Sequence, residues 1–414
     1  MNIGIHRIEF FFPKLYIDQK DLEIHDNVPG KYVIGLGQHK MSLTSPFDDI
    51  QSMCLTVLRR LIENTQIDLK KVGYLEVGTE TIIDKSKSIK TVLMQLFEES
   101  GNFDVAGIDT KNACFSGTSA LFNALNWLES SSCRERYAIV IAADIAMYKD
   151  VRARPTGGAG AIAMLLGRNA KVTFNLDERL FCMRNYYDFY KPVMLSDYPI
   201  VDGVQSLNCY REALINCFHK LNAILEDNGS KAKNEEVIGY FDYFLFHCPF
   251  VKLVQKSFSS IVLEEFKRFG SLKCLKPEES RLIQETLSEA DVKKRDNSML
   301  SACERLFNEK TSPSLTCARN CGNMYSASLY ASLYSLLINL HPIEDMKDDV
   351  KMCLFSYGSG YASSLFTITI RPHVVNSNTF KVVDEPGTFL SRLERERVKI
   401  FPCDINIENK KYSI

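Results

Sequence analysis

One cysteine lies in a local setting that suits chemistry. Cys114 ends an extended stretch, small residues follow it, and apolar residues then recur at helical spacing over 121–128. This pattern predicts a thiol at a helix N-terminus, where unpaired N–H groups and the helix dipole favour a thiolate over a thiol. We expect a nucleophile there. The alternative is a small buried hydrophobe, the usual state of one cysteine among thirteen.

An acidic loop and a histidine are candidates for proton transfer. Glu80 follows an apolar run at 72–77, and its immediate neighbours are mostly small or apolar. A poorly hydrated carboxylate with raised basicity is therefore expected, although a solvated loop carboxylate is the alternative. His247 directly follows a second apolar run at 240–246. This position suits either a histidine in a functional site or a core histidine whose ring nitrogens are hydrogen-bonded.

A pair of lysines could hold an anionic group. Lys252 and Lys256 are one helical turn apart after His247, so one helix face can present both ammonium groups. A solvated helix face is the alternative. The glycines at 157–158 and 358–360 lack the spacing of a Walker or dinucleotide-binding loop.

The bulk composition excludes several classes of protein. The 414 residues are 45% hydrophobic and 24% charged, with a net charge of -1, which is typical of a globular protein without a basic field for nucleic acid or anionic membrane. No run of about 18 apolar residues occurs, and residues 1–10 resemble a strand more than a targeting peptide. A cytosolic location is expected. Cys317 and Cys321 lack a second ligand pair, so no metal site is predicted.

The elements that must position these residues alternate between helix and strand. Apolar residues recur at helical spacing over 50–62, whereas 72–77 has strand character. Residues 137–143 form a near-continuous apolar run, the pattern of a strand buried on both faces. This alternation predicts an α/β fold.

A weak internal repeat is also present. Strand 72–77, the Cys114 turn and strand 137–143 recur in order as strand 240–246, the Asn323 turn and strand 350–355. The repeat places Glu80 opposite His247, and Cys114 opposite Asn323. Charged segments near 226–236 and 266–300 interrupt the second copy and predict a surface loop and solvated helices without a catalytic role.

Seven blocks of this sequence, taken in order, resemble the 3-hydroxy-3-methylglutaryl-CoA synthase family of the eukaryotic type, within the thiolase superfamily. The resemblance runs from about residue 3 to about residue 370. Several blocks are long and chemically unusual, which makes the resemblance specific. They comprise residues 75–88, 107–120, 153–160, 187–192, 246–249, 322–325 and 355–360.

The resemblance implies a thiolase-like fold of two pseudo-repeated, βαβ-rich halves in an α/β/α/β/α layer order. We expect residues 1–170 to form the half that carries Glu80 and Cys114. Residues 171–414 would form the half that carries His247 and Asn323.

The implied reaction condenses acetyl-CoA with acetoacetyl-CoA and water to 3-hydroxy-3-methylglutaryl-CoA, on the mevalonate route to isoprenoids. A cysteine nucleophile suits this chemistry because sulfur preserves the thioester, whose α-protons are more acidic than those of an oxygen ester. No cofactor other than the CoA thioesters is implied. A homodimer is expected, without nucleic acid or membrane as a partner.

The resemblance also assigns roles to single residues. Cys114 would carry the acetyl group, Glu80 would be the general acid/base, and His247 would orient and polarise the acetoacetyl ketone. The backbone N–H of Ser359, with that of Cys114, would form an oxyanion hole. The remaining expected substrate contacts are Thr156, Ser206, Lys252, Lys256 and Asn323, and the expected supporting residues are Asp144 and Asp188.

Three departures from the family pattern stand out. Phe115-Ser-Gly117 replaces the common Tyr-Gly-Gly, which removes a phenol near the site. Arg152 replaces a common Asn, which could alter the CoA contact. The sequence ends soon after Lys411, and this puts the closing strand of the second half in question.

Two other functions compete with this interpretation. A ketoacyl synthase or thiolase would share the cysteine, but would normally pair it with His/Asn or His/His and lack Glu80. A catalytically silent CoA-binding paralogue is suggested by the altered 115–117 turn and the short C-terminus. The combination of Glu80, Cys114 and His247 favours the active condensing enzyme.

Overall fold

A mixed sheet of nine strands forms the frame of the protein. The computed structural model describes residues 2–193, 196–233, 235–374 and 380–404. Strand order across the sheet is β11-β12-β13-β8-β1-β7-β6-β4-β5. The strands are β1 (Ile3–Phe11), β4 (Val72–Gly78), β5 (Asp109–Thr110), β6 (Tyr137–Ala146), β7 (Gly158–Arg168), β8 (Val172–Met183), β11 (Tyr243–Phe246), β12 (Val350–Gly358) and β13 (Ala362–Ile370).

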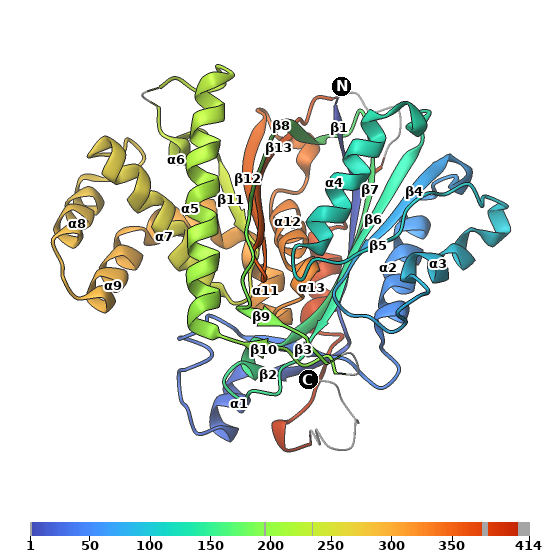
Figure 1. Ribbon diagram of the computed structural model, residues 1–414, viewed down its shortest axis with the longest axis horizontal. Helices are drawn as coiled ribbons and strands as arrows, with labels where there is room; N and C mark the ends of the chain where they lie inside the picture. The colour runs from blue at the N-terminus through green and yellow to red at the C-terminus, as the bar shows by residue number, and fades with distance from the viewer. Residues whose placement is uncertain (1, 194–195, 234, 375–379, 405–414) are drawn as a thin grey trace.

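The sheet is divided into two halves that meet at a narrow junction. Strands β1 and β8 pair at only two positions, Gly4 with Thr173 and Ile5 with Val172. On either side of this junction the strands diverge into two layers, and the central helices occupy the space between them (Figure 1). Because the junction is so short, the two halves of this one sheet form two separate layers.

Helices complete a five-layer arrangement. Helix α4 packs on β4 and β6 of one half, and α12 packs on β11 and β12 of the other. Helix α2 covers the outer face of the first half, where it contacts β1, β6 and β7, and α5 covers the outer face of the second. The principal helices are α2 (Ile50–Thr65), α4 (Ser116–Glu129), α5 (Gly203–Asp227), α7 (Val251–Phe269), α11 (Thr316–Cys321) and α12 (Ser328–Asn339).

The two halves have the same internal order. Counted outward from the junction, β1-β7-β6-β4 corresponds to β8-β13-β12-β11. The α/β class, the repeat and the layer order predicted from the sequence are confirmed. The sheet ends differ, because the first half has an additional edge strand, β5, beyond β4.

One predicted strand is shorter than expected. The apolar run at 240–246 was predicted to be a strand throughout, but helix α6 (Val237–Tyr240) ends within it and β11 begins only at Tyr243. A short apolar run has the same pattern in a buried helix end and in a strand, so periodicity alone does not place the boundary.

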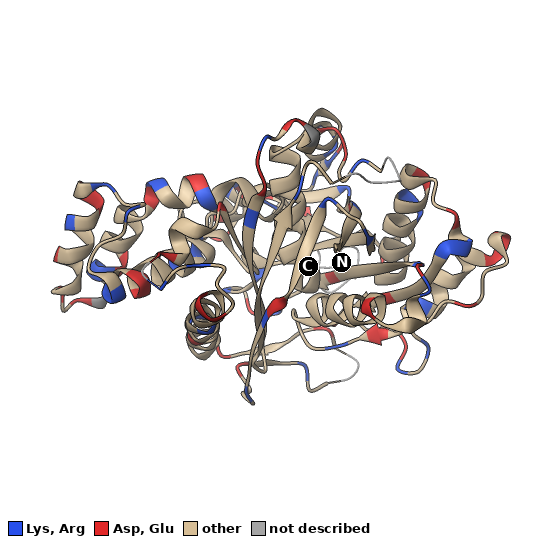
Figure 2. Ribbon diagram, turned by 90° about the horizontal axis from the view of Figure 1, so that it is seen from above, with Lys and Arg blue, Asp and Glu red and all other residues tan. Residues whose placement is uncertain are grey.

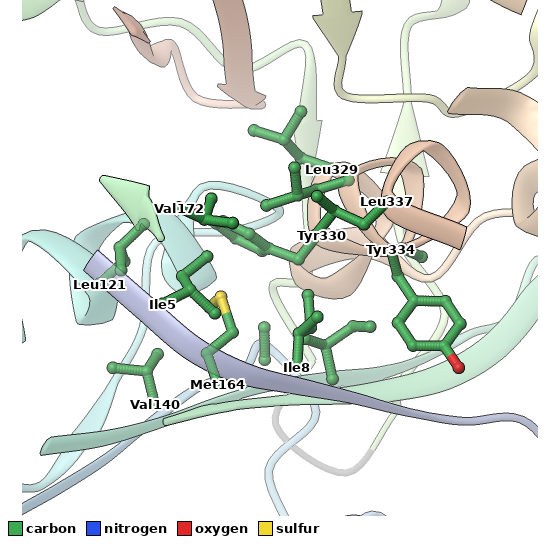
Figure 3. Packing of buried hydrophobic residues seen from close by; sticks show 14 of the residues in the cluster. Ile5, Ile8, Leu121, Val140, Met164, Val172, Leu329, Tyr330, Tyr334 and Leu337 are labelled. Carbon is green, nitrogen blue, oxygen red and sulfur yellow. The ribbon is translucent and has the colours of Figure 1, made fainter. Parts of the chain in front are cut away.

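The central core lies between the two sheet halves. Side chains from α4 and α12 interdigitate there with residues of the strands that flank the junction, as Figure 3 shows. Burial of such side chains from water is the main stabilising contribution. The labelled members are Ile5, Ile8, Leu121, Val140, Met164, Val172, Leu329, Tyr330, Tyr334 and Leu337.

Three further hydrophobic clusters lie outside the central core: one under α2, one under α5 and α7, and a small one that includes Ile17, Leu22 and Met41. The charged segment at 266–300 was predicted to form solvated helices. It contains the end of α7, the whole of α8 (Pro277–Leu287) and most of α9 (Val292–Ala302). Lys/Arg and Asp/Glu residues alternate along this part of the molecule, at the left in Figure 2. The remaining helices are α1 (Gln19–His25), α3 (Ile89–Leu93), α8 (Pro277–Leu287), α9 (Val292–Ala302), α10 (Glu304–Lys310) and α13 (Pro386–Glu394).

The smaller elements fall into a three-stranded sheet and a hairpin. Strand β13 pairs with both β8 and β12, so the closing strand that the short C-terminus put in question is present. Within the described ranges no helix is long and apolar enough to cross a membrane. The short strands are β2 (Leu15–Asp18), β3 (Lys40–Leu43) and β14 (Val398–Lys399) in the small sheet, and β9 (Phe189–Tyr190) and β10 (Ile200–Val201) in the hairpin.

Substitution of Gly4 tests the importance of the junction. A Cβ atom at Gly4 would lie 1.9 Å from the carbonyl oxygen of Val172, so Gly4→Ala must push β1 and β8 apart. We expect the free energy of unfolding to fall by about 1–3 kcal/mol or more. Gly203→Ala is the control, because a Cβ there meets no atom within 4 Å. Equal melting temperatures for the two variants would contradict this role of the junction.

Candidate active site

Cys114 lies in a tight turn between β5 and α4. Ala113 has a φ of 45°, in the left-handed region, and this reverses the chain just before the cysteine. Ser116 stabilises the turn, because its hydroxyl donates to the Ala113 carbonyl and accepts from the Asn112 N–H. Gly117 lets α4 approach the second half, since a Cβ there would lie 2.6 Å from the Ser326 carbonyl oxygen. The small residues after Cys114 thus serve turn formation and close packing.

The thiol faces a carboxylate. The Sγ of Cys114 lies 3.8 Å from Oε2 of Glu80 and donates to it. Burial raises the pKa of the Cys114 thiol well above its ordinary value, and the negative charges of Glu80 and Asp144 raise it further. The thiolate predicted from the helix end is therefore wrong for the free protein. Two nearby anions and the lack of solvent outweigh the field of the helix N-terminus.

Glu80 has the raised basicity that its sequence context predicted. Its side chain is only 6% exposed, and burial raises the pKa of its carboxyl to about 7, with Lys191 opposing the shift and Asp144 adding to it. The ammonium of Lys191 lies 2.8 Å from Oε1. At neutral pH this carboxyl is close to its midpoint and can both accept and return a proton.

Asp144, at the end of β6, holds the Glu80 loop in place. Its Oδ1 accepts from the backbone N–H groups of Glu80 (2.8 Å) and Thr81 (3.0 Å), and from the hydroxyls of Thr79 and Thr81. Its Oδ2 accepts from the backbone N–H and the hydroxyl of Ser326, just before α12. One buried carboxylate thus joins the acidic loop of the first half to the central helix of the second.

Two tyrosines that the sequence analysis did not single out line the same site. Tyr325 is buried and Tyr148 is half-buried, and their ring centroids are 6.1 Å apart. Burial raises the pKa of both phenols, and the charges of Glu80 and Cys114 raise it further. Tyr148 and Tyr325 remain protonated at neutral pH and can act as hydrogen-bond donors. Tyr325 lies within the block 322–325 of the family resemblance, and this was the sequence signal that could have identified it as a site residue.

Asn323 lies beside these phenols. Its Nδ2 is 3.4 Å from the Tyr148 hydroxyl, while its Oδ1 accepts from the Tyr325 N–H and the Ser328 hydroxyl. Its backbone N–H donates to the carbonyl of Thr156, at 3.2 Å. The amide oxygen is thus occupied by the turn before α12, and the amide nitrogen faces the site.

His247 lies at the end of β11, the strand equivalent to β4. Its backbone N–H donates to the Phe355 carbonyl, and its own carbonyl accepts from the Tyr210 hydroxyl. Burial lowers the pKa of the imidazole to about 3, so it is neutral at physiological pH. No hydrogen bond joins its ring to Glu80 or Cys114 within the described part of the chain.

The other expected substrate contacts lie on α5 and α7. Ser206 is in the first turn of α5. In α7, the Lys252 ammonium donates to Oε1 of Gln255 at 3.0 Å, and the Lys256 ammonium lies 3.8 Å from Asp296 on α9. Burial lowers the pKa of Lys252, and the neighbouring charge of Lys256 lowers it further. The ammonium groups of Lys252 and Lys256 are therefore close to each other on α7, as their spacing in the sequence predicted.

The turn after β12 closes over the cysteine turn. A Cβ at Gly358 would lie 2.5 Å from the backbone nitrogen of Phe115, so the two turns are in direct contact. Asp188 braces the Gly358–Gly360 turn by accepting from the Gly360 N–H at 2.9 Å and from the Tyr357 hydroxyl at 3.3 Å. Ser359 is therefore held close to the chain around Cys114.

Two departures from the family pattern have clear structural positions. Phe115 is buried under the Gly358 turn. The phenols of Tyr148 and Tyr325 still flank Glu80 and Cys114. Arg152 points into solvent, where it pairs with Asp150 at 2.7 Å. This ion pair is largely exposed, so the expected effect of Arg152 on the CoA contact stays a prediction.

A cavity of about 420 Å³ adjoins Glu80. Its walls come from the Glu80 loop, the turn before Cys114 and the segment that follows β9. They combine apolar side chains with the cations of Lys85, Lys111 and Lys191. Asp197 also lines the cavity and Lys191 is paired with Glu80, so Lys85 and Lys111 leave a small excess of positive charge at an opening through which a ligand could approach Glu80.

Family models match the chain over almost its whole length. The model described as the N-terminal part of hydroxymethylglutaryl-coenzyme A synthase matches residues 1–171, and that of the C-terminal part matches 172–408. Hydroxymethylglutaryl-CoA synthase 2 of Blattella germanica is 46% identical, over 97% of this chain and 88% of its own length. The cytoplasmic enzyme of Gallus gallus is 44% identical over 99% and 79%, and the mitochondrial enzyme of Rattus norvegicus 46% over 96% and 79%.

Solved structures show the same architecture. MvaS in complex with 3-hydroxy-3-methylglutaryl coenzyme A superposes with a TM-score of 0.82 at 26% identity, covering 97% of this chain and 90% of that one. A HMG-CoA synthase complexed with CoA superposes with a TM-score of 0.69 at 23% identity, over 95% and 91%, and supports the fold alone.

Removal of the Ser326 hydroxyl tests the Asp144 network. Ser326→Ala deprives a buried carboxylate of one donor, so we expect a loss of about 1–3 kcal/mol in the free energy of unfolding. Ser332→Ala, in the same region, is the control, because the Ser332 hydroxyl has no partner among the described residues. Chemical denaturation measures both variants. A Ser326→Ala variant as stable as Ser332→Ala would show that the network does not hold the loop.

Proposed function

This chain belongs to the hydroxymethylglutaryl-CoA synthase family of acyl-CoA condensing enzymes, and we propose that Cys114, Glu80 and His247 perform the condensation in it. The observation that carries this proposal is the 3.8 Å contact between the Cys114 sulfur and a buried carboxyl with a pKa of about 7. A thiol and a base in contact provide both the nucleophile and the proton acceptor that the reaction needs.

Acetyl transfer comes first in the proposed sequence. Glu80 takes the thiol proton as the Cys114 sulfur attacks the carbonyl carbon of acetyl-CoA. The new S–C bond forms, the bond from carbon to the CoA sulfur breaks, and the leaving thiolate takes the proton from Glu80, which is then ionised again. Because the thiol is protonated in the free protein, deprotonation accompanies the attack.

Condensation follows. Glu80 removes a proton from the acetyl methyl group, and the resulting enolate carbon attacks the ketone of acetoacetyl-CoA. A C–C bond forms, and the alkoxide takes a proton from the protonated Glu80. His247 is neutral, since its pKa is lowered to about 3, and so orients and polarises the ketone as a hydrogen-bonding imidazole rather than as a cation.

Hydrolysis completes the cycle. Water attacks the thioester at Cys114, the S–C bond breaks, and 3-hydroxy-3-methylglutaryl-CoA leaves with a free carboxylate while the thiol is restored. The contact between the Gly358 turn and Phe115 supports an oxyanion hole formed by the N–H groups of Cys114 and Ser359. The product would supply isoprenoid synthesis by the mevalonate route.

Substrate binding is assigned to residues around these groups. Thr156 and Asn323 adjoin each other beside Tyr148, which supports contacts with acetoacetyl-CoA. Ser206, Lys252 and Lys256 would contact the CoA portion, with the paired ammonium groups meeting its phosphates. No cofactor beyond the CoA thioesters enters this scheme.

A homodimer and a cytosolic location complete the proposal. Strand β5 lies at the edge of the sheet, where unpaired backbone groups can pair with a second chain. Ile82, Ile83, Phe103 and Ile108 are exposed near it. Cytoplasmic enzymes among the relatives support the location, and cell fractionation would distinguish it from the mitochondrial location of the rat relative.

Glu80→Ala provides the sharpest test of the reaction. Mass spectrometry after incubation with acetyl-CoA should find the wild-type acetyl group on the peptide that contains Cys114. The variant should still acquire acetyl, more slowly, but condensation should fall by about 10²- to 10⁴-fold, because only enolate formation requires removal of an α-proton.

Two controls make that experiment decisive. Cys114→Ser should abolish the thioester label, and acetylation of any other cysteine would overturn the nucleophile assignment. A Glu80→Ala variant that forms 3-hydroxy-3-methylglutaryl-CoA at a near-normal rate would refute the role of Glu80 as the base. A wild-type protein that acetylates Cys114 but forms no 3-hydroxy-3-methylglutaryl-CoA would favour a ketoacyl synthase or thiolase. A wild-type protein that neither acetylates nor condenses would be a silent paralogue.

The dimer proposal predicts the effect of a charge at the sheet edge. Ile108 is 61% exposed beside β5, so Ile108→Lys would place an ammonium group in the interface. We expect sedimentation velocity to show a shift from dimer to monomer. Ile34→Lys is the matched control at an isoleucine that is 77% exposed elsewhere, and it should leave the dimer intact. A dimer that survives Ile108→Lys would place the interface elsewhere.

A further inference from the structure

A lysine with no assigned role contacts the proposed base. Lys191 follows directly after β9, its side chain is 17% exposed, and its ammonium lies 2.8 Å from Oε1 of Glu80. We propose that Lys191 is a positioning residue, which orients the Glu80 carboxylate toward Cys114 and keeps it ionisable in its buried setting. This inference rests on the proposed role of Glu80 as the base.

The two oxygens of Glu80 have different partners. Oε1 meets the Lys191 ammonium, and Oε2 meets the Cys114 sulfur at 3.8 Å. The terminal torsion of a glutamate is broad and has no strong preference of its own. An ion pair at one oxygen therefore selects the rotation that points the other oxygen at the nucleophile.

Lys191 is itself held in place from two sides. Its predecessor Tyr190 pairs with Ile200 in the β9–β10 hairpin, which fixes the backbone. The ammonium lies 5.1 Å from the centroid of the Tyr325 ring, and the Phe189 ring packs at 5.9 Å from the same ring. A lysine anchored in this way can hold a carboxylate in a fixed orientation.

Lys191 has a different electrostatic effect on Glu80 from that of the other groups around this carboxyl. Asp144 on β6 and the polar groups of Cys114, Tyr148 and Tyr325 face the carboxyl, and none of these is a cation. Lys85 and Lys111 line the same cavity but are exposed, and within the described ranges neither pairs with Glu80. Lys191 is thus the cation that opposes burial and Asp144.

The direction of the effect on ionisation follows. Burial lowers the pKa of the Lys191 ammonium, but the combined attraction of Glu80, Asp144 and Asp197 outweighs it and the net shift is upward, so Lys191 stays charged. Its charge lowers the pKa of Glu80, which burial nevertheless raises to about 7. Without Lys191 the carboxyl would titrate at higher pH, and less of it would be ionised at neutrality.

The test compares Lys191→Met, Lys191→Arg and the control Lys111→Met, at a lysine in the wall of the same cavity. The turnover number for condensation is measured against pH. Wild type should lose activity as the pH falls below about 7, because the base becomes protonated. In Lys191→Met this acid limb should move to higher pH by about one to three pH units, with turnover at pH 7 down by about tenfold or more. In Lys191→Arg and Lys111→Met the turnover number should fall with decreasing pH at the same pH as in the wild type.

A structural role for Lys191 would give a different result. If Lys191→Met is slower at every pH but has an unshifted acid limb, or if Lys191→Arg fails to restore the limb, the proposal is wrong. Infrared titration of the protonated-carboxyl band, assigned by its loss in Glu80→Gln, reads the same ionisation without turnover. A shifted band in a wild-type-like fold would support Lys191 even if the protein proved inactive, so failure of the proposed function and failure of this inference remain distinguishable.

Discussion

The buried carboxylate of Asp144 is the contact on which the active site depends. A charged group without access to water must have its hydrogen-bonding capacity filled by the protein. Asp144 meets this requirement with donors from the Glu80 loop on one oxygen and from Ser326 on the other. Because those donors belong to different halves of the molecule, solvation of one side chain also aligns the Glu80 loop with the helix that follows Asn323. The cost of an unpaired buried charge makes this alignment difficult to disturb.

The arrangement of the sheet explains how the site can be both buried and shared. The narrow junction of β1 and β8 separates two layers, and the first turns of α4 and the segment before α12 meet between them. Cys114 and Asn323 lie at equivalent places in the repeat, as do Glu80 and His247, yet each pair differs in chemistry. The repeat therefore provides two similar backbone frameworks, and matching positions in them carry side chains of different chemistry. A thiol and a carboxyl come from one half, and an imidazole and an amide from the other.

Much of this was accessible from the sequence, for identifiable reasons. The apolar run at 137–143 and the recurrence of strand and turn predicted the α/β repeat, and the small, apolar neighbours of Glu80 predicted its raised pKa. The predicted thiolate state of Cys114 was wrong because only the local helix end was considered, whereas Glu80 and Asp144 approach the thiol from distant segments. Tyr148 was missed for the same reason, and Lys191 and Tyr325, although they lie within blocks of the family resemblance, were given no role. Their proximity to Glu80 is created by the hairpin and the central helices, which no local pattern encodes.

The pKa of about 7 for Glu80 has an energetic consequence for the proposed cycle, in which Glu80 takes up a proton and gives it back. If the pKa of Glu80 were much lower, its carboxylate would be too weak a base to remove a proton from carbon. If the pKa were much higher, the carboxyl would stay protonated and no base would be available for the next turnover. A group near its midpoint has almost equal free energies in its two forms at neutral pH, so neither form is a thermodynamic trap. The opposing effects of burial and of the neighbouring ammonium thus make proton storage on this side chain nearly thermoneutral.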